Sequence, residues 1–221
     1  MRIGLFGGTF NPIHRGHLRA ASEVIKRFNL DQIFLIPAAL PPHKTPGLVA
    51  SAADRLEMIN LAIADLCGLT VSDVELKRPG PSYTIDTIHH FKNSLSPGAR
   101  IYLIMGLDAF LEIHTWKSHR GLLEQIAFIV MARPGKDHSD ARQGWRIMEN
   151  YLKSTLSADY QFDAARACYT SAGQQPIYIV DIDALDISST EIREKVKRKQ
   201  RIENLVTPEV ADYIRLKGLY R

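Results

Sequence analysis

The chain has 221 residues, of which 45% are hydrophobic and 24% are charged, a composition typical of one or two globular domains and not of disordered, collagen-like or coiled-coil proteins. No apolar run approaches the roughly 18 residues of a membrane helix, and the N-terminus lacks the apolar core and cleavage site of a signal peptide. We therefore expect a cytoplasmic protein with no membrane partner. Cys67 and Cys168 belong to no CxxC pair or ligand cluster, so we expect buried, reduced thiols.

The charge balance is only mildly basic. Lys and Arg number 28 against 24 Asp and Glu, which gives a formal net charge of +4. Cations concentrate in Arg193–Arg201 (REKVKRKQR), and a run of this kind is usually a solvated helix face. A nucleic-acid arm is the alternative, but we expect no nucleic-acid partner. An anionic small molecule would also suit the run, at least at Arg193.

The first half of the chain alternates between strand and helix patterns. A β-prone run is broken by two glycines, and a helical stripe of apolar residues follows from Gly16. A proline-rich loop at Pro37–Pro46 can continue neither strand nor helix. The predicted strands are Arg2–Phe6, Gln32–Ile36 and Leu69–Ser72, and a second helix is predicted at Asp54–Ala64.

The second half continues the alternation with strands that are apolar throughout. Continuous apolar strands indicate burial on both faces, which favours a parallel sheet with helical crossovers. We expect a doubly wound, Rossmann-like α/β fold with helices on both faces and a small C-terminal helical part, forming a single domain over 1–221 with a polar excursion at about 135–175. The predicted elements are helix Thr84–Leu95, strand Ile101–Met105, short helix Asp108–Ile113, strands Ala127–Ala132 and Ile177–Ile182, a helix from Ser189, and helix Pro208–Lys217.

Gly7–His17 (GGTFNPIHRGH) lies where the first strand ends and the first helix begins, the position at which open α/β sheets bind ligands. Paired glycines let backbone N–H groups approach an anion, and a helix N-terminus adds unsatisfied donors. His14 and His17, three residues apart, would point the same way on one turn. The segment therefore predicts a polyphosphate site, although it is neither a P-loop nor a GxGxxG fingerprint. Zinc ligation and plain helix capping remain alternatives for the two histidines.

Ile187–Arg193 (ISSTEIR) supplies a second set of anion-binding groups. Ser188, Ser189 and Thr190 offer capping oxygens and donors at a helix start, and Arg193 lies about one turn into that helix. By itself this string would be merely a capped helix start. Together with Gly7–His17 it predicts a shared polyphosphate site.

The two segments resemble the GxFxPxHxGH and ISSTxIR motifs of the HxGH nucleotidyltransferases, which join a nucleoside triphosphate to a phosphorylated acceptor. The middle of the chain resembles, more narrowly, the bacterial nicotinate mononucleotide adenylyltransferases. The segments that carry this resemblance are Pro41–Lys44 (PPHK), Pro81–Thr87 (PSYTIDT), Gly106–Asp108 (GLD) with Trp116, and the C-terminal Gly218–Arg221 (GLYR).

The resemblance implies transfer of the adenylyl group of ATP to nicotinate mononucleotide, giving deamido-NAD and pyrophosphate in NAD biosynthesis. The implied attack is direct and in line, by the acceptor phosphate on the α-phosphorus of ATP. Mg²⁺ is expected to arrive with ATP, held by phosphates and water, with no metal ligand from the protein. A homo-oligomer stays open.

Each implied site residue also has a plainer structural interpretation. Thr84 could be a capping residue, Trp116 a core aromatic, Asp108 the N-cap of the next helix, and Lys44 and Arg133 solvent-facing cations. The implied catalytic residues are His14, His17, Lys44 and Arg193. ATP-binding residues are Gly7, Gly8, Thr9, Phe10, Gly16, Gly106, Asp108, Arg133, Ser188, Ser189 and Thr190, and nicotinate-nucleotide-binding residues are Tyr83, Thr84 and Trp116.

Two competing interpretations remain. Another acceptor, such as a phosphopantetheine or a nicotinamide nucleotide, would keep the same chemistry, and Thr84 with Trp116 argues against it. A nucleotide-binding regulator or nucleic-acid binder would instead show salt-dependent polynucleotide binding and no pyrophosphate release.

Overall fold

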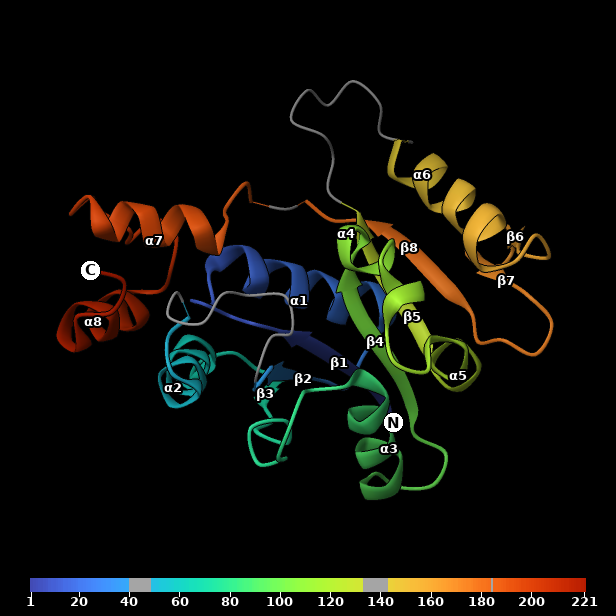
Figure 1. Ribbon diagram of the computed structural model, residues 1–221, viewed down its shortest axis with the longest axis horizontal. Helices are drawn as coiled ribbons and strands as arrows, with labels where there is room; N and C mark the ends of the chain where they lie inside the picture. The colour runs from blue at the N-terminus through green and yellow to red at the C-terminus, as the bar shows by residue number, and fades with distance from the viewer. Residues whose placement is uncertain (40–48, 133–142, 184) are drawn as a thin grey trace. The chain divides into compact units, whose positions relative to one another are not determined.

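The computed structural model describes residues 1–39, 49–132, 143–183 and 185–221 (Figure 1). These residues contain an eight-stranded, mostly parallel sheet with strand order β3-β2-β1-β4-β5-β8-β7-β6. The first six positions follow the doubly wound order 3-2-1-4-5-6, with β8 in the sixth place. The strand order reverses at β1 (Arg2–Gly8), so the predicted α/β class is confirmed and the first motif follows the strand at the reversal.

The chain divides into two compact units, and the division falls within β1. Unit 1 contains Met1–Leu5 and Tyr83–Asp183, and unit 2 contains Phe6–Ser82 and Ala184–Arg221. Among the described residues, no helix has the length and apolar character needed to cross a membrane.

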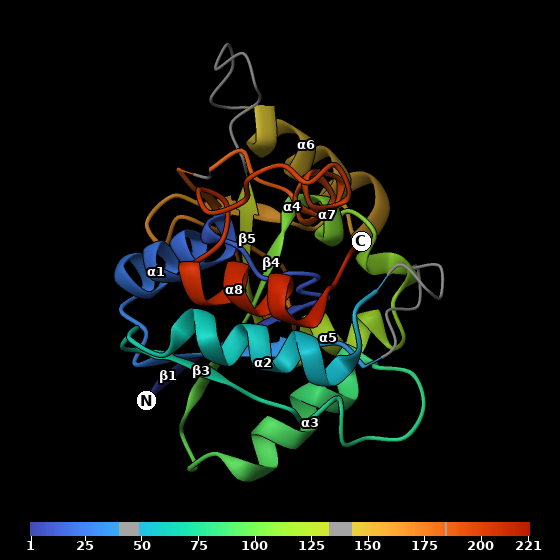
Figure 2. The same ribbon diagram turned by 90° about the vertical axis from the view of Figure 1, so that its left-hand side faces the viewer.

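Unit 2 packs four helices with two further strands. Its elements are α1 (Arg15–Phe28), β2 (Gln32–Pro37), α2 (Ala52–Ile63), β3 (Leu69–Val71), α7 (Ser189–Lys197) and α8 (Pro208–Lys217). Strands β2 and β3 are parallel, with Ile33 opposite Leu69. Helices α2 and α8 lie side by side (Figure 2), and Met58 and Val210 are both fully buried.

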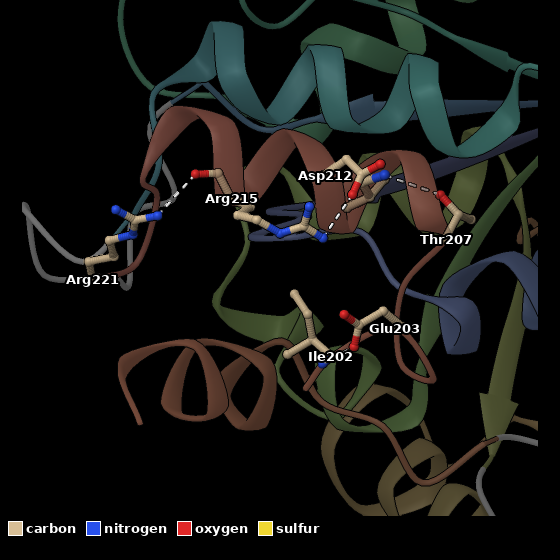
Figure 3. A network of polar contacts seen from close by, with 7 residues as sticks. Ile202, Glu203, Thr207, Asp212, Arg215 and Arg221 are labelled. Carbon is tan, nitrogen blue, oxygen red and sulfur yellow. Dashed lines mark hydrogen bonds and ion pairs between the residues drawn. The ribbon is translucent and has the colours of Figure 1, made fainter. Parts of the chain in front are cut away.

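The C-terminus of unit 2 is held by local polar contacts (Figure 3). Thr207 caps α8 by accepting from the Val210 N–H, and Arg215 pairs with Asp212 at 2.8 Å. Gly218 ends the helix in the left-handed region, with a φ of 63°, and the Leu219 N–H then donates to the Ile214 carbonyl. Glycine suits this position because it has no Cβ to clash there. The chain is thereby turned back after α8.

Unit 1 is built around three parallel strands. β4 (Arg100–Gly106) pairs with β5 (Ala127–Ala132), and β5 pairs with β8 (Ile177–Asp181). The core of these strands is apolar throughout, as predicted, with Phe128 and Ile129 fully buried. The helical elements and remaining strands are α3 (Thr84–Ser94), α4 (Leu107–Phe110), η1 (Ile113–Thr115), α5 (His119–Gln125), α6 (Gln143–Tyr151), η2 (Leu152–Leu156), β6 (Gln161–Asp163) and β7 (Cys168–Thr170).

The excursion is more ordered than its composition indicates. From 143 onward it forms helix α6, the π-helical turn η2 and the hairpin β6–β7, whose strand β7 pairs antiparallel with β8. Met148, Leu152 and Tyr160 are fully buried, and the Trp145 Nε1–H donates to Asp181 Oδ2 at 3.1 Å. Residues 143–151 are therefore helical despite their polar composition, and the sheet is not wholly parallel.

Two local predictions were wrong. Helix Asp108–Ile113 is instead the single turn α4, beginning at Leu107, followed by the 3₁₀ turn η1. Both cysteines are free, as expected, but only Cys168 is buried, whereas Cys67 lies exposed after α2.

Candidate active site

His14 and His17 stack face to face at the start of α1. His14 occupies the N-cap position with extended backbone, and it is 4% exposed. The two ring centroids are 3.6 Å apart with planes inclined by 26°, and the His14 N–H donates to His17 Nδ1 at 3.3 Å. The expectation that both imidazoles share one side of the turn is confirmed. The capping interpretation is confirmed for His17, whose Nδ1 accepts from the N-cap backbone, and a ligand-binding role stays a prediction.

Phe10 supports His17 from the loop. Its ring is 2% exposed and meets the His17 ring edge to face at 5.1 Å. A Cβ on Gly8 would lie 3.0 Å from the Phe10 ring, so a side chain at position 8 would displace this support. A Cβ on Gly16 would likewise lie 3.0 Å from His14 Nδ1. The ring positions thus depend on these two glycines.

Gly7 differs from the other glycines of the loop. It is exposed, and a Cβ placed on it would meet no atom within 4 Å among the described residues. Its missing side chain therefore serves no internal packing. Bare backbone facing open space is the surface that lets an anion approach N–H groups closely.

The second motif is hydrogen-bonded to the first, although 177 positions separate their contacting residues. Ser189 Oγ donates to the Pro12 carbonyl at 2.9 Å, and Arg193 Nη1 donates to the Asn11 carbonyl at 2.9 Å. Arg193 Nη2 also donates to Thr190 Oγ1 at 3.1 Å. The N-termini of α1 and α7 are thereby held together.

The hydroxyls of the second motif have structural partners. Ser188 is the N-cap of α7 and accepts from the Glu191 N–H at 3.1 Å, while Ser189 is bonded to the first motif. Farther along α7, Lys195 and Lys197 pair with Glu191 and Glu194 at 3.7 and 3.5 Å. The basic run therefore begins as a solvated helix face whose lysines are paired.

Gly106 and Asp108 form a second group of predicted residues, in unit 1. Gly106 is the N-cap of α4, so the interpretation of Asp108 as the N-cap is wrong. Asp108 is exposed in the first helical turn, and its carboxylate lies so close to Gly106 that a Cβ there would collide with Oδ1. A side chain at position 106 would therefore displace the Asp108 carboxylate from this position.

Tyr83, Thr84 and Trp116 belong to segments that meet in unit 1. Tyr83 is the N-cap of α3, and Thr84 is the first helical residue and not the cap. Lys117 Nζ lies 4.2 Å from the Tyr83 ring centroid and 3.6 Å from Asp86 Oδ2, which joins the residue after Trp116 to the start of α3. Trp116 is half-buried and does not belong to the fully buried core, and its role stays a prediction.

Several predictions lie beyond this geometry. Lys44 and Arg133 fall outside the described residues. Over the described ranges, no group of three or more His, Cys, Asp or Glu side chains is arranged to hold a metal ion.

Two cavities of about 480 and 600 Å³ lie at the start of β4 and between α7 and α8. Neither is lined by the predicted site residues.

Sequence reasoning assigned no role to three residues that contact these segments. Arg55 and Tyr220 both contact the first-motif loop, and Lys117 lies beside Tyr83. Arg55 carried a signal that could have been used, because it interrupts the apolar positions of a predicted helix. Tyr220 lies in the C-terminal segment Gly218–Arg221 that carried the resemblance, whereas nothing local marks Lys117.

Known proteins are similar to this chain over its whole length. A family model described as cytidylyltransferase-like matches residues 5–195. A protein of Desulfatibacillum aliphaticivorans, named a probable nicotinate-nucleotide adenylyltransferase, is 42% identical over 221 residues, covering 100% of both chains. A protein of the same name from Citrifermentans bemidjiense is 37% identical, covering 100% of this chain and 98% of its own.

A solved structure shares the fold. The nicotinic acid mononucleotide adenylyltransferase of Plasmodium falciparum, complexed with NaAD, superposes with a TM-score of 0.73 at 21% identity, covering 99% of this chain and 97% of that one. The likeness at this identity concerns the fold alone.

Proposed function

The chain belongs to the cytidylyltransferase-like family and, within it, to the nicotinate-nucleotide adenylyltransferases, and we propose that it transfers the adenylyl group of ATP to nicotinate mononucleotide, releasing pyrophosphate and forming nicotinate adenine dinucleotide. The observation that carries this proposal is the hydrogen-bonded junction of the two motifs at Pro12–Ser189 and Asn11–Arg193. It gathers two helix N-termini, two imidazoles and a guanidinium, which together suit a triphosphate.

The proposed reaction is a direct in-line displacement. An oxygen of the nicotinate mononucleotide phosphate attacks the α-phosphorus of ATP, and the bond from that phosphorus to the bridging oxygen of pyrophosphate breaks. Well-oriented reactants gain about 7–11 kcal/mol from alignment alone, so the chain needs no covalent intermediate. His14, His17, Lys44 and Arg193 then stabilise the negative charge that gathers on the phosphoryl and leaving oxygens.

Mg²⁺ is proposed to enter with ATP. The donors of the motif junction are N–H groups, imidazoles and a guanidinium, which bind phosphate oxygens and do not compete for the metal. When bound, Mg²⁺ supplies charge neutralisation on the phosphates. The chain's own part is to hold the phosphate oxygens in place around it.

Unit 1 is proposed to bind the bases and the ribose. The half-buried Trp116 offers a π face to the pyridine ring, and the N–H groups at the start of α3, with the Thr84 hydroxyl, suit the nicotinate carboxylate. Asp108 suits ribose hydroxyls, because it is exposed directly after β4. Arg133 is proposed to contact ATP.

The test is pyrophosphate release by the purified protein from ATP and Mg²⁺, with nicotinate mononucleotide, nicotinamide mononucleotide and phosphopantetheine offered separately. A strong preference for nicotinate mononucleotide, with the dinucleotide identified by mass, supports the proposal. Preference for another acceptor would keep the adenylyl transfer but refute the assignment of Thr84 and Trp116. No release with any acceptor would overturn the proposed reaction.

A further inference from the structure

Arg55 is a buried cation whose partners are backbone carbonyls. It lies in α2 and is 1% exposed. Its Nη1 donates to the Thr9 carbonyl at 2.8 Å, Nε to the Ala50 carbonyl at 3.2 Å, and Nη2 to the Ala39 carbonyl at 3.4 Å. Burial of an arginine without a carboxylate is costly, so three carbonyls sharing one guanidinium indicate a specific task.

The three carbonyls come from segments that the proposed reaction uses. Thr9 belongs to the first motif, and Ala39 and Ala50 lie on either side, in sequence, of the segment that contains Lys44. The rigid fork of a guanidinium can serve several acceptors in fixed directions, which a flexible ammonium cannot. Arg55 therefore joins the phosphate-binding loop to both flanks of a second segment.

The bond to Thr9 also fixes the direction of a donor. The Thr9–Phe10 peptide is not among the cis bonds, and in a planar trans peptide the carbonyl and the next N–H point to opposite sides. With the Thr9 carbonyl held toward α2, the Phe10 N–H points away from α2. The orientation of a loop donor thus depends on a side chain 46 positions away.

Tyr220 provides a second tie to the same loop. Its hydroxyl donates to Asn11 Oδ1 at 2.8 Å, and the same oxygen accepts from the Ala50 N–H at 2.9 Å. Ala50 is consequently held through its N–H by Asn11 and through its carbonyl by Arg55. Tyr220 has a φ of 64°, a conformation unfavourable for tyrosine, which indicates that its surroundings enforce the contact.

We propose that Arg55 is a positioning residue for adenylyl transfer, which acts with Tyr220 to hold the first-motif loop and the flanks of the Lys44 segment in register. The inference rests on the proposed function. It predicts that loss of the guanidinium impairs turnover more than substrate binding, because the loop would be misaligned in the transition state without losing its contacts to the substrate.

The experiment measures kcat and KM for both substrates in Arg55→Lys, Arg55→Ala and Tyr220→Phe, with Met58→Ala on the same helix as a control for lost stability. We expect kcat of Arg55→Lys to fall by about tenfold to a hundredfold, with KM for nicotinate mononucleotide changed far less. Tyr220→Phe should show a smaller loss of the same kind. Millimolar guanidinium chloride, but not sodium chloride, should partly restore kcat of Arg55→Ala.

Three results would overturn the inference: unchanged kcat in folded Arg55→Lys, a kcat loss no larger than that of Met58→Ala at equal thermal midpoint, or no rescue of folded Arg55→Ala by guanidinium. If Arg55→Ala fails to fold, Arg55→Lys and Tyr220→Phe still decide the question. Pyrophosphate release by the native protein tests the proposed function separately. If the native protein releases none, the proposed reaction is refuted, whereas a kcat loss found only in the variants concerns the positioning of the loop.

Discussion

At the residue scale, the chemistry of the first motif depends on packing around two imidazoles. His17 is stacked on His14, met edge-on by Phe10, and bonded through Nδ1 to the His14 N–H. With Nδ1 accepting that bond, the neutral ring carries its proton on Nε2 and can donate from there. The neighbours of His17 therefore select both its orientation and its donor.

His17→Ala is expected to lower kcat by about a hundredfold to a thousandfold, the usual loss when one transition-state donor is removed. The half-buried ring accounts for one cap bond and its ring contacts, so the thermal midpoint should fall by only about 2–4 °C. Pyrophosphate release and thermal unfolding are the measurements, with the exposed His89→Ala as the matched control. Unchanged turnover in a folded His17→Ala would remove His17 from the mechanism.

Trp116→Ala is expected to raise KM for nicotinate mononucleotide about fivefold or more, because a lost cation–π contact of about 1 kcal/mol corresponds to that factor. KM for ATP should change little. Steady-state kinetics with each substrate varied in turn measures the split. Trp145→Phe is the control, since Trp145 is bonded to Asp181 within the fold. An equal rise in both KM values would make Trp116 structural.

At the element scale, helix α7 connects stability with the proposed phosphate site. Ser188 caps the helix, Ser189 ties it to Pro12, and Arg193 ties it to Asn11. The hydroxyls thus make structural bonds, and in the proposed function the positive end of the helix faces the phosphates.

Substitutions at Ser188 can separate these two contributions. Ser188→Ala should lower the free energy of unfolding by about 1 kcal/mol, because the cap to the Glu191 N–H is lost. Ser188→Asp should keep that stability, because aspartate caps equally well, but it should raise KM for ATP through repulsion of the phosphates. Urea unfolding and ATP kinetics measure the two effects. Unaltered ATP kinetics in Ser188→Asp would place the triphosphate away from this helix end.

At the scale of the whole molecule, each of the two units has its own core and its own group of candidate site residues. Unit 2 holds the motif junction at the starts of α1 and α7, and unit 1 holds Asp108, Thr84 and Trp116 beside β4 and α3. The hairpin and α6 add a further buried cluster to unit 1, which includes Tyr160.

Stability is expected to fall above about pH 10, partly through Tyr160. Burial raises the pKa of the Tyr160 phenol, whereas the phenol of the unfolded chain ionises near its ordinary pKa. The unfolded state therefore loses this proton first. The stability that the buried phenol contributes is intact below about pH 10 and is lost as pH rises, by up to about 1.4 kcal/mol per pH unit. Urea unfolding between pH 8 and pH 11 should show a shallower decline for Tyr160→Phe; identical slopes would contradict the assignment.

Much of the fold follows from local patterns. The apolar runs at 101–105, 127–132 and 177–182 became β4, β5 and β8, because fully buried parallel strands leave an unbroken apolar signature. The short helix after β4 was misjudged, since a helix of one turn offers too few residues for a periodic pattern. The hairpin β6–β7 was missed because strands of three residues are too short for an alternating apolar pattern to stand out within a polar segment.

The sequence by itself determined the two segments proposed to bind phosphate, their order and the chemistry they suit, because glycines, histidines, capping hydroxyls and an arginine carry those properties locally. Only the tertiary structure decided that the segments touch, that the serine hydroxyls are used in joining and capping, and that Arg55 and Tyr220 hold the loop. The physical reason is that a contact across scores of residues is fixed by packing and burial of the whole unit, whereas local propensity acts only over neighbouring residues.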